Sequence, residues 1–171
     1  MANSTFDLTG KTALVTGGNG CIGLCMAKAL AQSGADICIW GQNEEKNKTA
    51  AEKIAAYGGQ VAAFKCNVSD ENQVEENFAR TVEALGKVDT CFANAGVGSM
   101  GTPFHNMDIS EWRNVFGVNM EGVFFTFRSA IRHMLEREDG GSLVVTSSLS
   151  AKYGMPRGEH YAATKAGVVA I

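Results

Sequence analysis

The sequence predicts an α/β fold in which one doubly wound parallel sheet has helices on both faces. Short runs rich in β-branched residues alternate with longer segments of helical periodicity along the whole chain, as they do in parallel sheets. Most of the short runs carry apolar residues at consecutive positions, so both faces of each strand are expected to be buried. The chain has 171 residues, of which 45% are hydrophobic and 19% charged, and we interpret residues 1–171 as one globular domain.

The alternation resolves into strands and long helices. Strands are predicted over residues 11–16, 36–40, 60–65, 88–92 and 142–147. Helices are predicted over 21–33, 44–57, Glu71–Leu85 and 110–137, where apolar residues recur at spacings of three and four. Glycines after Ser33 and Tyr57 mark helix ends, and Asp70 and Asp108 are in position to cap helix starts.

Two irregular segments, 96–107 and 149–159, follow the fourth and fifth predicted strands. Both leave the carboxyl edge of the sheet, where ligands bind in open α/β folds, so the active site is expected there. The chain ends at Ile171 inside a further helical pattern that has no glycine cap, and we expect the domain to be incomplete at its C-terminus. Without a further strand beside it, Leu143-Val144-Val145 is expected to form an exposed apolar edge.

Charge and cysteine content argue against several classes of protein. The 15 Lys and Arg residues and the 18 Asp and Glu residues are interspersed, which gives a net charge of −3 and no basic surface for nucleic acid or anionic lipid. The uncharged stretch 12–27 is interrupted by glycines and is no membrane helix, and the chain starts without a cationic signal region, so a cytoplasmic location is expected. The five cysteines include no C-x-x-C pair, which favours reduced thiols over disulfides or a metal site, and we interpret Cys21 and Cys25 as small buried side chains.

The predicted strand 11–16 runs directly into a glycine-rich turn, Gly17-Gly18-Asn19-Gly20-Cys21-Ile22-Gly23, and then into a helix. A dinucleotide pyrophosphate needs this order, because glycines let backbone N–H groups approach the phosphates and the helix N-terminus supplies partial positive charge. Residues 18–23 also satisfy the pattern G-x-G-x-x-G, which is weak alone but here follows the first strand. We therefore predict a nucleotide site at this turn.

A second group of residues points to acid–base chemistry. Tyr161 and Lys165 stand four positions apart in the last helical pattern, so their side chains leave the same helix face with Cβ atoms ~5–6 Å apart. A nearby ammonium favours the phenolate form of a tyrosine by charge attraction, which suits the tyrosine to general acid–base catalysis. Ser148 follows the fifth predicted strand and adds a hydroxyl at the same edge of the sheet.

Together these motifs resemble the short-chain dehydrogenase/reductase family over the whole length of the chain. The segments that carry the resemblance are Thr16-Gly17-x-x-x-Cys21-Ile22-Gly23 for T-G-x-x-x-G-I-G, Asn67-Val68 for D-V, Asn94-Ala95-Gly96 for N-A-G, Asn119 after Val118, Ser148 after Ser147, and Tyr161-x-x-x-Lys165 for Y-x-x-x-K. Their order and spacing are highly specific in combination.

The resemblance implies a Rossmann-type fold and an NAD(P)-dependent oxidoreductase that interconverts an alcohol and a carbonyl by hydride transfer. In the implied catalytic tetrad, Tyr161 protonates the carbonyl oxygen and Ser148 hydrogen-bonds it, while Lys165 holds the nicotinamide ribose and Asn119 keeps a water in a proton relay. The cofactor contacts it implies are Gly17, Asn19, Cys21, Ile22, Gly23, Gln42, Asn67, Val68, Asn94, Ala95, Gly96, Tyr161 and Lys165. It also implies a small-molecule alcohol or carbonyl substrate and a homodimer or homotetramer of the full-length protein.

The sequence departs from the family pattern in two regions. Cys21 replaces a glycine where the cofactor approaches most closely, and we expect it to weaken cofactor binding, whereas Asn67 replaces an aspartate but keeps a carbonyl acceptor for the adenine amino group. Residues 40–43, which include Gln42, offer neither a carboxylate for a ribose 2′-hydroxyl nor an arginine for a 2′-phosphate. The lack of a basic residue in the glycine turn favours NAD over NADP, although a contact from Lys46 or Lys48 would reverse this preference.

Alternative functions stay open at this point. Cys21 and the abrupt end of the chain also fit a catalytically impaired dinucleotide-binding or interaction protein, whereas the intact tetrad argues for an enzyme. A nucleotide-binding transferase on the same scaffold leaves the placement of Tyr161 and Lys165 unexplained. His160 is expected either to line the pocket or to face solvent, and His105 and His133 are expected at the surface.

Overall fold

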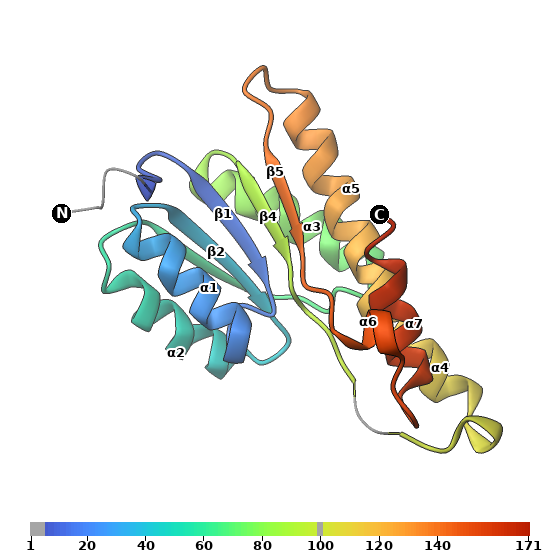
Figure 1. Cartoon of the computed structure of the whole chain (residues 1–171). Coiled ribbons are helices and arrows are strands. Elements are labelled where there is room, and N and C mark those ends of the chain that lie inside the picture. The colour runs from blue at the N-terminus through green and yellow to red at the C-terminus, as the bar shows by residue number, and fades with distance from the viewer. Residues whose placement is uncertain (1–5, 99–100) are drawn as a thin grey trace.

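The computed structural model describes residues 6–98 and 101–171, and it contains a parallel sheet with the strand order β3-β2-β1-β4-β5 (Figure 1). The strands are β1 (Thr12–Thr16), β2 (Asp36–Gly41), β3 (Val61–Lys65), β4 (Thr90–Ala93) and β5 (Ser142–Val145). The chain reverses its direction of travel across the sheet between β3 and β4, so the carboxyl ends of β1 and β4 form the switch point at which open α/β folds bind ligands. The predicted doubly wound fold is confirmed.

Helices cover both faces of this sheet (Figure 1). Helices α1 (Cys21–Gln32) and α2 (Glu44–Ala55) pack on one face, and α3 (Glu71–Leu85) and α5 (Gly122–Leu135) pack on the other. Beyond the carboxyl edge lie η2 (Phe104–Asn106), α4 (Ile109–Phe116), α6 (Ser150–Tyr153) and α7 (Glu159–Gly167). The irregular segments predicted after β4 and β5 therefore contain short helical pieces. Pieces of four residues or fewer are too short to leave a helical periodicity in the sequence.

The apolar runs of the strands divide between two cores, as expected for a sheet buried on both faces. Along β1, Ala13 and Val15 point to the helices α1 and α2, whereas Leu14 points to the α3 and α5 side. Along β2, Ile37 and Ile39 likewise pack in the core under α1 and α2, whereas Trp40 packs in the core under α3 and α5. The strands β1 to β4 thus each contribute to both cores, which fixes their register because a slip by one residue would exchange the two faces.

The helix predicted over 110–137 is continuous in direction but changes its hydrogen-bond pattern midway. Between α4 and α5 the segment η3 (Gly117–Glu121) forms a π turn, with its cap N–H bonded to the Gly117 carbonyl. Asp108 caps the start of α4 by accepting from the Ser110 N–H, and Asp70 caps α3 by accepting from the Gln73 N–H. The caps are confirmed, whereas the π turn was not predicted, because residues 110–137 follow one helical periodicity in the sequence.

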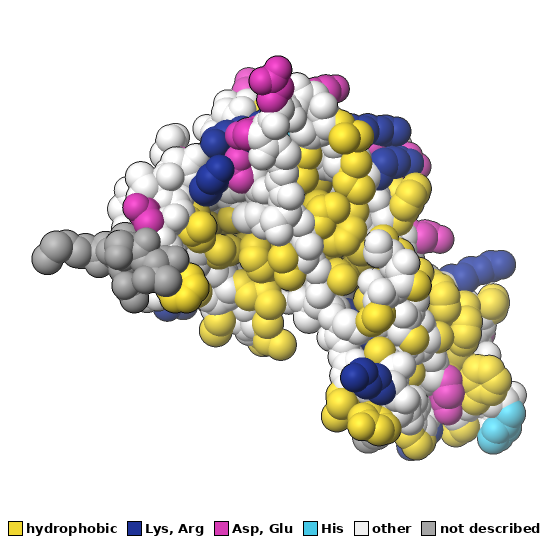
Figure 2. All heavy atoms as spheres, turned by 45° about the horizontal axis from the view of Figure 1, so that its top comes forward, with side chains coloured by type: hydrophobic (Ala, Val, Ile, Leu, Met, Phe, Trp, Pro, Cys, Tyr) yellow, Lys and Arg dark blue, Asp and Glu magenta, His cyan; other side chains and the backbone are white. Residues whose placement is uncertain are grey.

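The strand β5 lies at an edge of the sheet, with its first residues exposed. The side chain of Leu143 is 37% exposed, and Figure 2 shows hydrophobic side chains gathered over the middle of the face viewed there. The apolar edge predicted from Leu143-Val144-Val145 is therefore present in the part of the chain that the structure describes.

The amino edge of the sheet is held by a buried carboxylate, Asp89. It accepts hydrogen bonds from the Thr12 N–H (2.8 Å) and from Arg137 at the end of α5 (2.7 Å). Burial alone would raise the pKa of Asp89, but these hydrogen bonds and the charge of Lys87 outweigh it and hold the pKa below its ordinary value. The ionised carboxylate therefore stabilises the fold above the pKa it has in the unfolded chain, and this contribution is lost as the pH falls through its lower folded pKa.

Three expectations about single side chains are wrong. Cys21 and Cys25 are both exposed rather than buried, because the first turns of α1 face outward. His133 is half-buried: its Nε2 accepts a hydrogen bond from the Val88 N–H (3.2 Å) and its ring packs against Phe78. Burial, together with the neighbouring charge of Arg137, lowers the pKa of His133.

The buried thiols differ in kind from these exposed ones. Burial raises the pKa of Cys38 to about 12, that of Cys66 to about 11 and that of Cys91 to about 12, so they stay protonated.

Among residues 6–98 and 101–171 no helix is long and apolar enough to cross a membrane, and no group of three or more candidate side chains could hold a metal ion.

A buried hydroxyl joins α3 to the sheet and gives a test of the packing. The Thr81 Oγ1 accepts a hydrogen bond from the Trp40 indole N–H (3.1 Å) and donates to the Asn77 carbonyl (2.7 Å), and neither Trp40 nor Thr81 is exposed. Thr81→Val leaves the indole N–H without its acceptor, so we expect the free energy of unfolding to fall by about 1–3 kcal/mol. Urea unfolding followed by circular dichroism measures this loss.

Thr81→Ser is the matched control, because it keeps the hydroxyl and removes only a methyl group. It should lose clearly less stability than Thr81→Val. Equal midpoints for Thr81→Val and the unsubstituted protein would contradict this account of the packing.

Candidate active site

A cleft of about 1020 Å³ opens at the carboxyl ends of β1 and β4. It brings together most of the predicted cofactor-binding residues, namely Gly17, Asn19, Cys21, Ile22, Gly23, Asn94, Ala95, Gly96, Tyr161 and Lys165. Residues from the glycine turn, from the end of β4 and from α7 thus share one cavity, although they are separated by up to 148 positions between Gly17 and Lys165 in a chain of 171.

The glycine turn is packed so closely that two of its positions exclude a side chain. A Cβ at Gly23 would collide with the Gly17 carbonyl and would approach the Asn94 side-chain nitrogen to 2.6 Å. Gly17 has a φ of +65° and lies against the backbone of Ala95, where a Cβ would come within 3.0 Å of Cα. These glycines allow the start of α1 to sit directly against the end of β4.

Cys21 is the first residue of α1 and has a φ of +45°, a conformation that favours glycine. Its side chain is exposed and lines the cleft. The position therefore keeps a backbone conformation suited to glycine although it holds a cysteine, and the expected weakening of cofactor binding remains a prediction.

Hydroxyl and amide side chains tie the strand ends together beneath the cleft. The Thr16 Oγ1 accepts hydrogen bonds from the N–H groups of Asn94 (3.1 Å) and Ala95 (3.0 Å). The Asn94 side chain in turn donates to the Thr16 carbonyl (3.1 Å) and accepts from the Thr146 hydroxyl (3.1 Å). Asn94 therefore bridges the ends of β1 and β5 across β4.

Asn119 lies in the π turn and is completely buried. Its side-chain oxygen accepts from the Val97 N–H (2.8 Å), and its side-chain nitrogen donates to the Val97 carbonyl (2.8 Å) and to the Thr164 hydroxyl (3.2 Å). One amide therefore connects the segment after β4 to α7. The extra residue of the π turn is what turns this side chain inward at a helix position.

Tyr161 and Lys165 line the same cleft from α7. The Lys165 Nζ lies 5.7 Å from the centroid of the Tyr161 ring and donates a hydrogen bond to the Thr146 carbonyl at the end of β5 (2.7 Å). Lys165 is only 4% exposed, and this burial lowers its pKa from the ordinary value. A Cβ at Gly96 would lie 3.4 Å from this Nζ, so the chain passes directly beside the ammonium group.

The other predicted tetrad member, Ser148, follows β5 and is half-buried. Its hydroxyl is within hydrogen-bond distance of the Ser150 hydroxyl (2.9 Å) and accepts from the Ser150 N–H (3.2 Å). The preceding Ser147 donates to the Lys165 carbonyl (2.7 Å) and so anchors α7 to the strand end. The sequence analysis assigned the motif to the neighbouring Ser148 and therefore missed the anchoring role of Ser147.

Gln42, Asn67 and Val68 are predicted cofactor contacts that do not line the cleft. Gln42 donates to the Asn67 side-chain oxygen (3.4 Å), which also accepts from the Ser69 hydroxyl (2.9 Å). Val68 is buried in the α3 and α5 core, where it packs against Gly122. Contact of these residues with a cofactor therefore remains a prediction.

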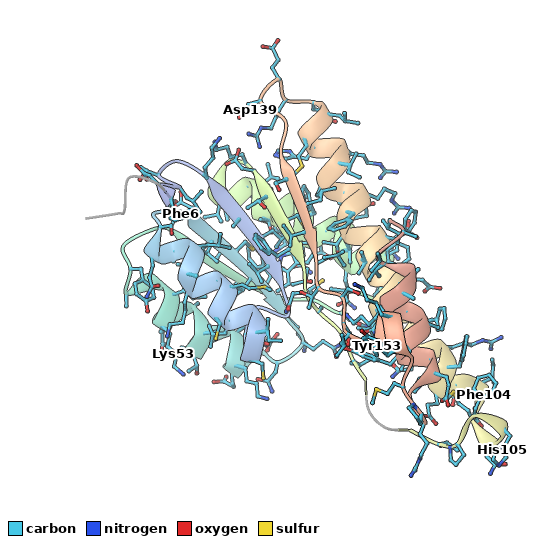
Figure 3. The ribbon with its side chains drawn as sticks, in the orientation of Figure 1. Phe6, Lys53, Phe104, His105, Asp139 and Tyr153 are labelled. Atoms are coloured by element: carbon cyan, nitrogen blue, oxygen red, sulfur yellow. The ribbon has the colours of Figure 1, made fainter. Side chains whose placement is uncertain are left out.

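The cleft also extends along α2, where the sequence analysis singled out only Lys46 and Lys48. Glu45, Lys46, Thr49 and Lys53 line it, and Lys53 projects from α2 in Figure 3. The spacing of 46, 49, 50 and 53 marks a single helix face, and this is the signal that could have identified it. Lys48 is not among the lining residues.

One of the two expected placements of His160 is wrong, because this residue does not face solvent. It is 1% exposed, and its Nε2 lies 3.6 Å from a carboxylate oxygen of Glu111 on α4. His105 is exposed on η2, as expected, and projects from the far end of the molecule in Figure 3.

Comparisons with known proteins identify the family of this chain. The model of the family described as short chain dehydrogenase matches residues 11–171. A 3-oxoacyl-(acyl-carrier-protein) reductase of Chlamydia pneumoniae is 34% identical over 164 residues, which are 96% of this chain and 65% of that protein. An L-rhamnose 1-dehydrogenase (NAD(P)(+)) of Sphingomonas sp. (strain SKA58) is 37% identical over 165 residues, which are 94% of this chain and 63% of that protein.

Solved structures give the same result. A short-chain type dehydrogenase/reductase from Mycobacterium marinum superposes with a TM-score of 0.92 at 31% identity, covering 98% of this chain and 68% of that one. The chain thus spans about 65% of the length of the curated relatives it matches. On the family model, the relatives and the fold together, this chain belongs to the short-chain dehydrogenase/reductase family.

Proposed function

We propose that this protein is an NAD(P)-dependent oxidoreductase that interconverts an alcohol and a carbonyl, with Tyr161 as the general acid and base. The observation that carries the proposal is that Tyr161, Lys165 and the glycine turn open on one cleft. An acid–base pair and a phosphate-binding turn in a single cavity suit a reaction that moves a proton and a hydride together.

The residues present fit a dinucleotide. The turn between β1 and α1 offers backbone without side chains at Gly17 and Gly23, where a Cβ would have no room, and it ends at the N-terminus of a 12-residue helix. Asn19, Ile22 and Ala95 would line the bound cofactor, and Lys165 would hold its nicotinamide ribose. When bound, the nicotinamide supplies or accepts the hydride.

In this proposal the protein's own groups handle the proton and the carbonyl oxygen. Tyr161 gives its phenolic proton to the oxygen in reduction and takes it back in oxidation, and Ser148 donates a hydrogen bond to the same oxygen. Lys165 places positive charge 5.7 Å from the ring centroid, which favours the phenolate that remains. Asn119 would hold a water that returns the proton to solvent.

The names of the relatives suggest the substrate class only in general terms. Their names include a 3-oxoacyl thioester reductase, an L-rhamnose dehydrogenase and sorbose reductases. A panel of one 3-oxoacyl thioester, sorbose and L-rhamnose therefore samples the alcohols and carbonyls against which activity should first be measured.

A homodimer or homotetramer belongs to the same proposal. The outer face of α5 exposes Phe124, Ile131 and Leu135, and Leu135 is 80% exposed. A stripe of this kind along one helix is typical of a surface that packs against a partner.

Tyr161→Phe tests the proposed acid–base role. It removes the phenolic proton and keeps the ring, so kcat on any substrate of the panel should fall by about 10²-fold or more, while the NADH dissociation constant stays within about twofold. Steady-state kinetics and fluorescence titration measure the two quantities. Tyr153→Phe is the matched control, since Tyr153 lies exposed on α6 (Figure 3) and should keep full activity.

Cys21→Gly tests the departure in the glycine turn. The cysteine side chain lines the cleft at the turn where the pyrophosphate would approach, so removing it should let the glycine variant bind NADH roughly five- to tenfold more tightly. The φ of +45° is present without cofactor, so its cost of about 1–2 kcal/mol affects stability and not binding. Cys25→Ala, on the same helix outside the cleft, should bind as the unsubstituted protein does. Equal NADH dissociation constants for Cys21→Gly, Cys25→Ala and the unsubstituted protein would contradict this prediction.

Cys21 is also the observation that favours the second candidate function, a dinucleotide-binding protein with impaired catalysis. Under that alternative the unsubstituted protein turns over none of the panel, and Cys21→Gly restores cofactor binding without restoring activity. Measurable turnover by the unsubstituted protein excludes it.

We also propose NAD as the preferred cofactor, because the glycine turn carries no basic residue. Lys46 lines the cleft and is the cation that would meet a 2′-phosphate. NADH should therefore bind more tightly than NADPH, and Lys46→Ala should weaken NADPH binding about threefold to fivefold without changing NADH binding. Lys48→Ala is the control outside the cleft, and tighter binding of NADPH than of NADH would overturn the preference.

A further inference from the structure

Tyr161 lies against Gly98 in the segment that leaves β4, and described residues on either side of this contact are attached to other elements. A Cβ at Gly98 would collide with the Tyr161 ring, coming within 2.7 Å of Cε2, so the backbone there lies directly on the ring. Before this point, Asn119 holds both polar groups of the Val97 backbone. After it, a second attachment begins at Gly101.

The second attachment is built from groups that the proposed reaction does not use. Glu111 on α4 accepts a hydrogen bond from the Thr102 N–H (3.2 Å), and the same carboxylate oxygen lies 3.6 Å from the Nε2 of His160. His160 is the residue before Tyr161 on α7 and is 1% exposed. The pair therefore connects α4, the segment after β4 and the helix that carries the tyrosine.

Gly101 shows how closely this attachment is packed. A Cβ there would collide with the Glu111 carboxylate and lie 3.4 Å from the His160 ring. Its N–H donates to the Arg157 carbonyl (2.7 Å), and its carbonyl accepts from the Arg157 Nε (3.0 Å). Glu159 accepts from the Arg157 N–H (3.1 Å), so two charged side chains, those of Arg157 and Glu159, belong to this turn before Tyr161.

We propose that His160 and Glu111 are positioning residues for Tyr161. Together they tie the start of α7 to α4 one residue before Tyr161, which fixes where the tyrosine leaves its helix and so sets the direction of the phenolic hydroxyl. This inference rests on the proposed function of Tyr161. Neither residue touches the substrate, and their effect passes through the tyrosine.

The test compares His160→Leu with His160→Gln. Leucine fills the buried space without a polar atom, so kcat should fall about tenfold or more, while the NADH dissociation constant stays within about twofold because the glycine turn is untouched. Glutamine restores an N–H donor toward Glu111 and should recover most of the loss. His105→Leu, at an exposed histidine on η2, is the matched control and should change neither quantity.

A readout that needs no turnover separates this inference from the proposed function. Amide hydrogen exchange at Gly101 and Thr102 should be faster in His160→Leu than in the unsubstituted protein, and slow again in His160→Gln. If the unsubstituted protein turns over nothing in the panel, the proposed function fails and exchange alone decides the attachment.

Two results would overturn the positioning role. One is unchanged kcat and unchanged exchange in His160→Leu. The other is a loss of kcat and NADH binding in parallel that His160→Gln does not recover, which would show a general loss of packing.

Discussion

The side chain of Asn119 is the contact on which the arrangement of the cleft depends. Its amide is completely buried, and a buried amide without partners would cost several kcal/mol, so its hydrogen bonds to Val97 and Thr164 must be kept together. These partners belong to the segment after β4 and to α7, which the sheet itself does not connect. Because one planar group bonds both, the spacing between the strand exit and the helix carrying Tyr161 and Lys165 is set within the tolerance of a hydrogen bond.

Lys165 shows how the same region accommodates a buried charge. Removing an ammonium group from water is costly, and the lowered pKa of Lys165 reflects this burial. The Thr146 carbonyl compensates by accepting a hydrogen bond from Nζ, and Ser147 holds the Lys165 backbone from the next position. The end of β5 therefore supports the lysine from two directions. Among the described residues, the Thr146 carbonyl is the backbone group that accepts from the Lys165 Nζ, and the ammonium group lies at the cleft.

The sequence was sufficient for the fold and for the residues that share the cleft. Alternating periodicities predicted each strand and long helix of the described residues to within a few positions, and the motifs placed Tyr161, Lys165 and Asn94 correctly at one edge. What it could not show are features set by tertiary contacts. The burial of His160 depends on Glu111, which lies 49 positions away, and the outward face of Cys21 depends on how α1 docks. A local pattern records neither, because both features arise from contacts between elements that are distant in the sequence.

The π turn between α4 and α5 has a consequence for how this protein can change. A π turn is an α-helix with one residue too many, so deleting one position between Gly117 and Glu121 would restore regular helical bonding and yield a better helix. The wide turn takes up the extra residue, so α4 and α5 would keep the faces that they present and only the residues of the turn itself would change direction. Asn119 is one of these residues, and its amide would turn away from Val97 and Thr164. The helix therefore stays imperfect for the sake of one side chain, because repairing it would displace the amide that joins the segment after β4 to α7.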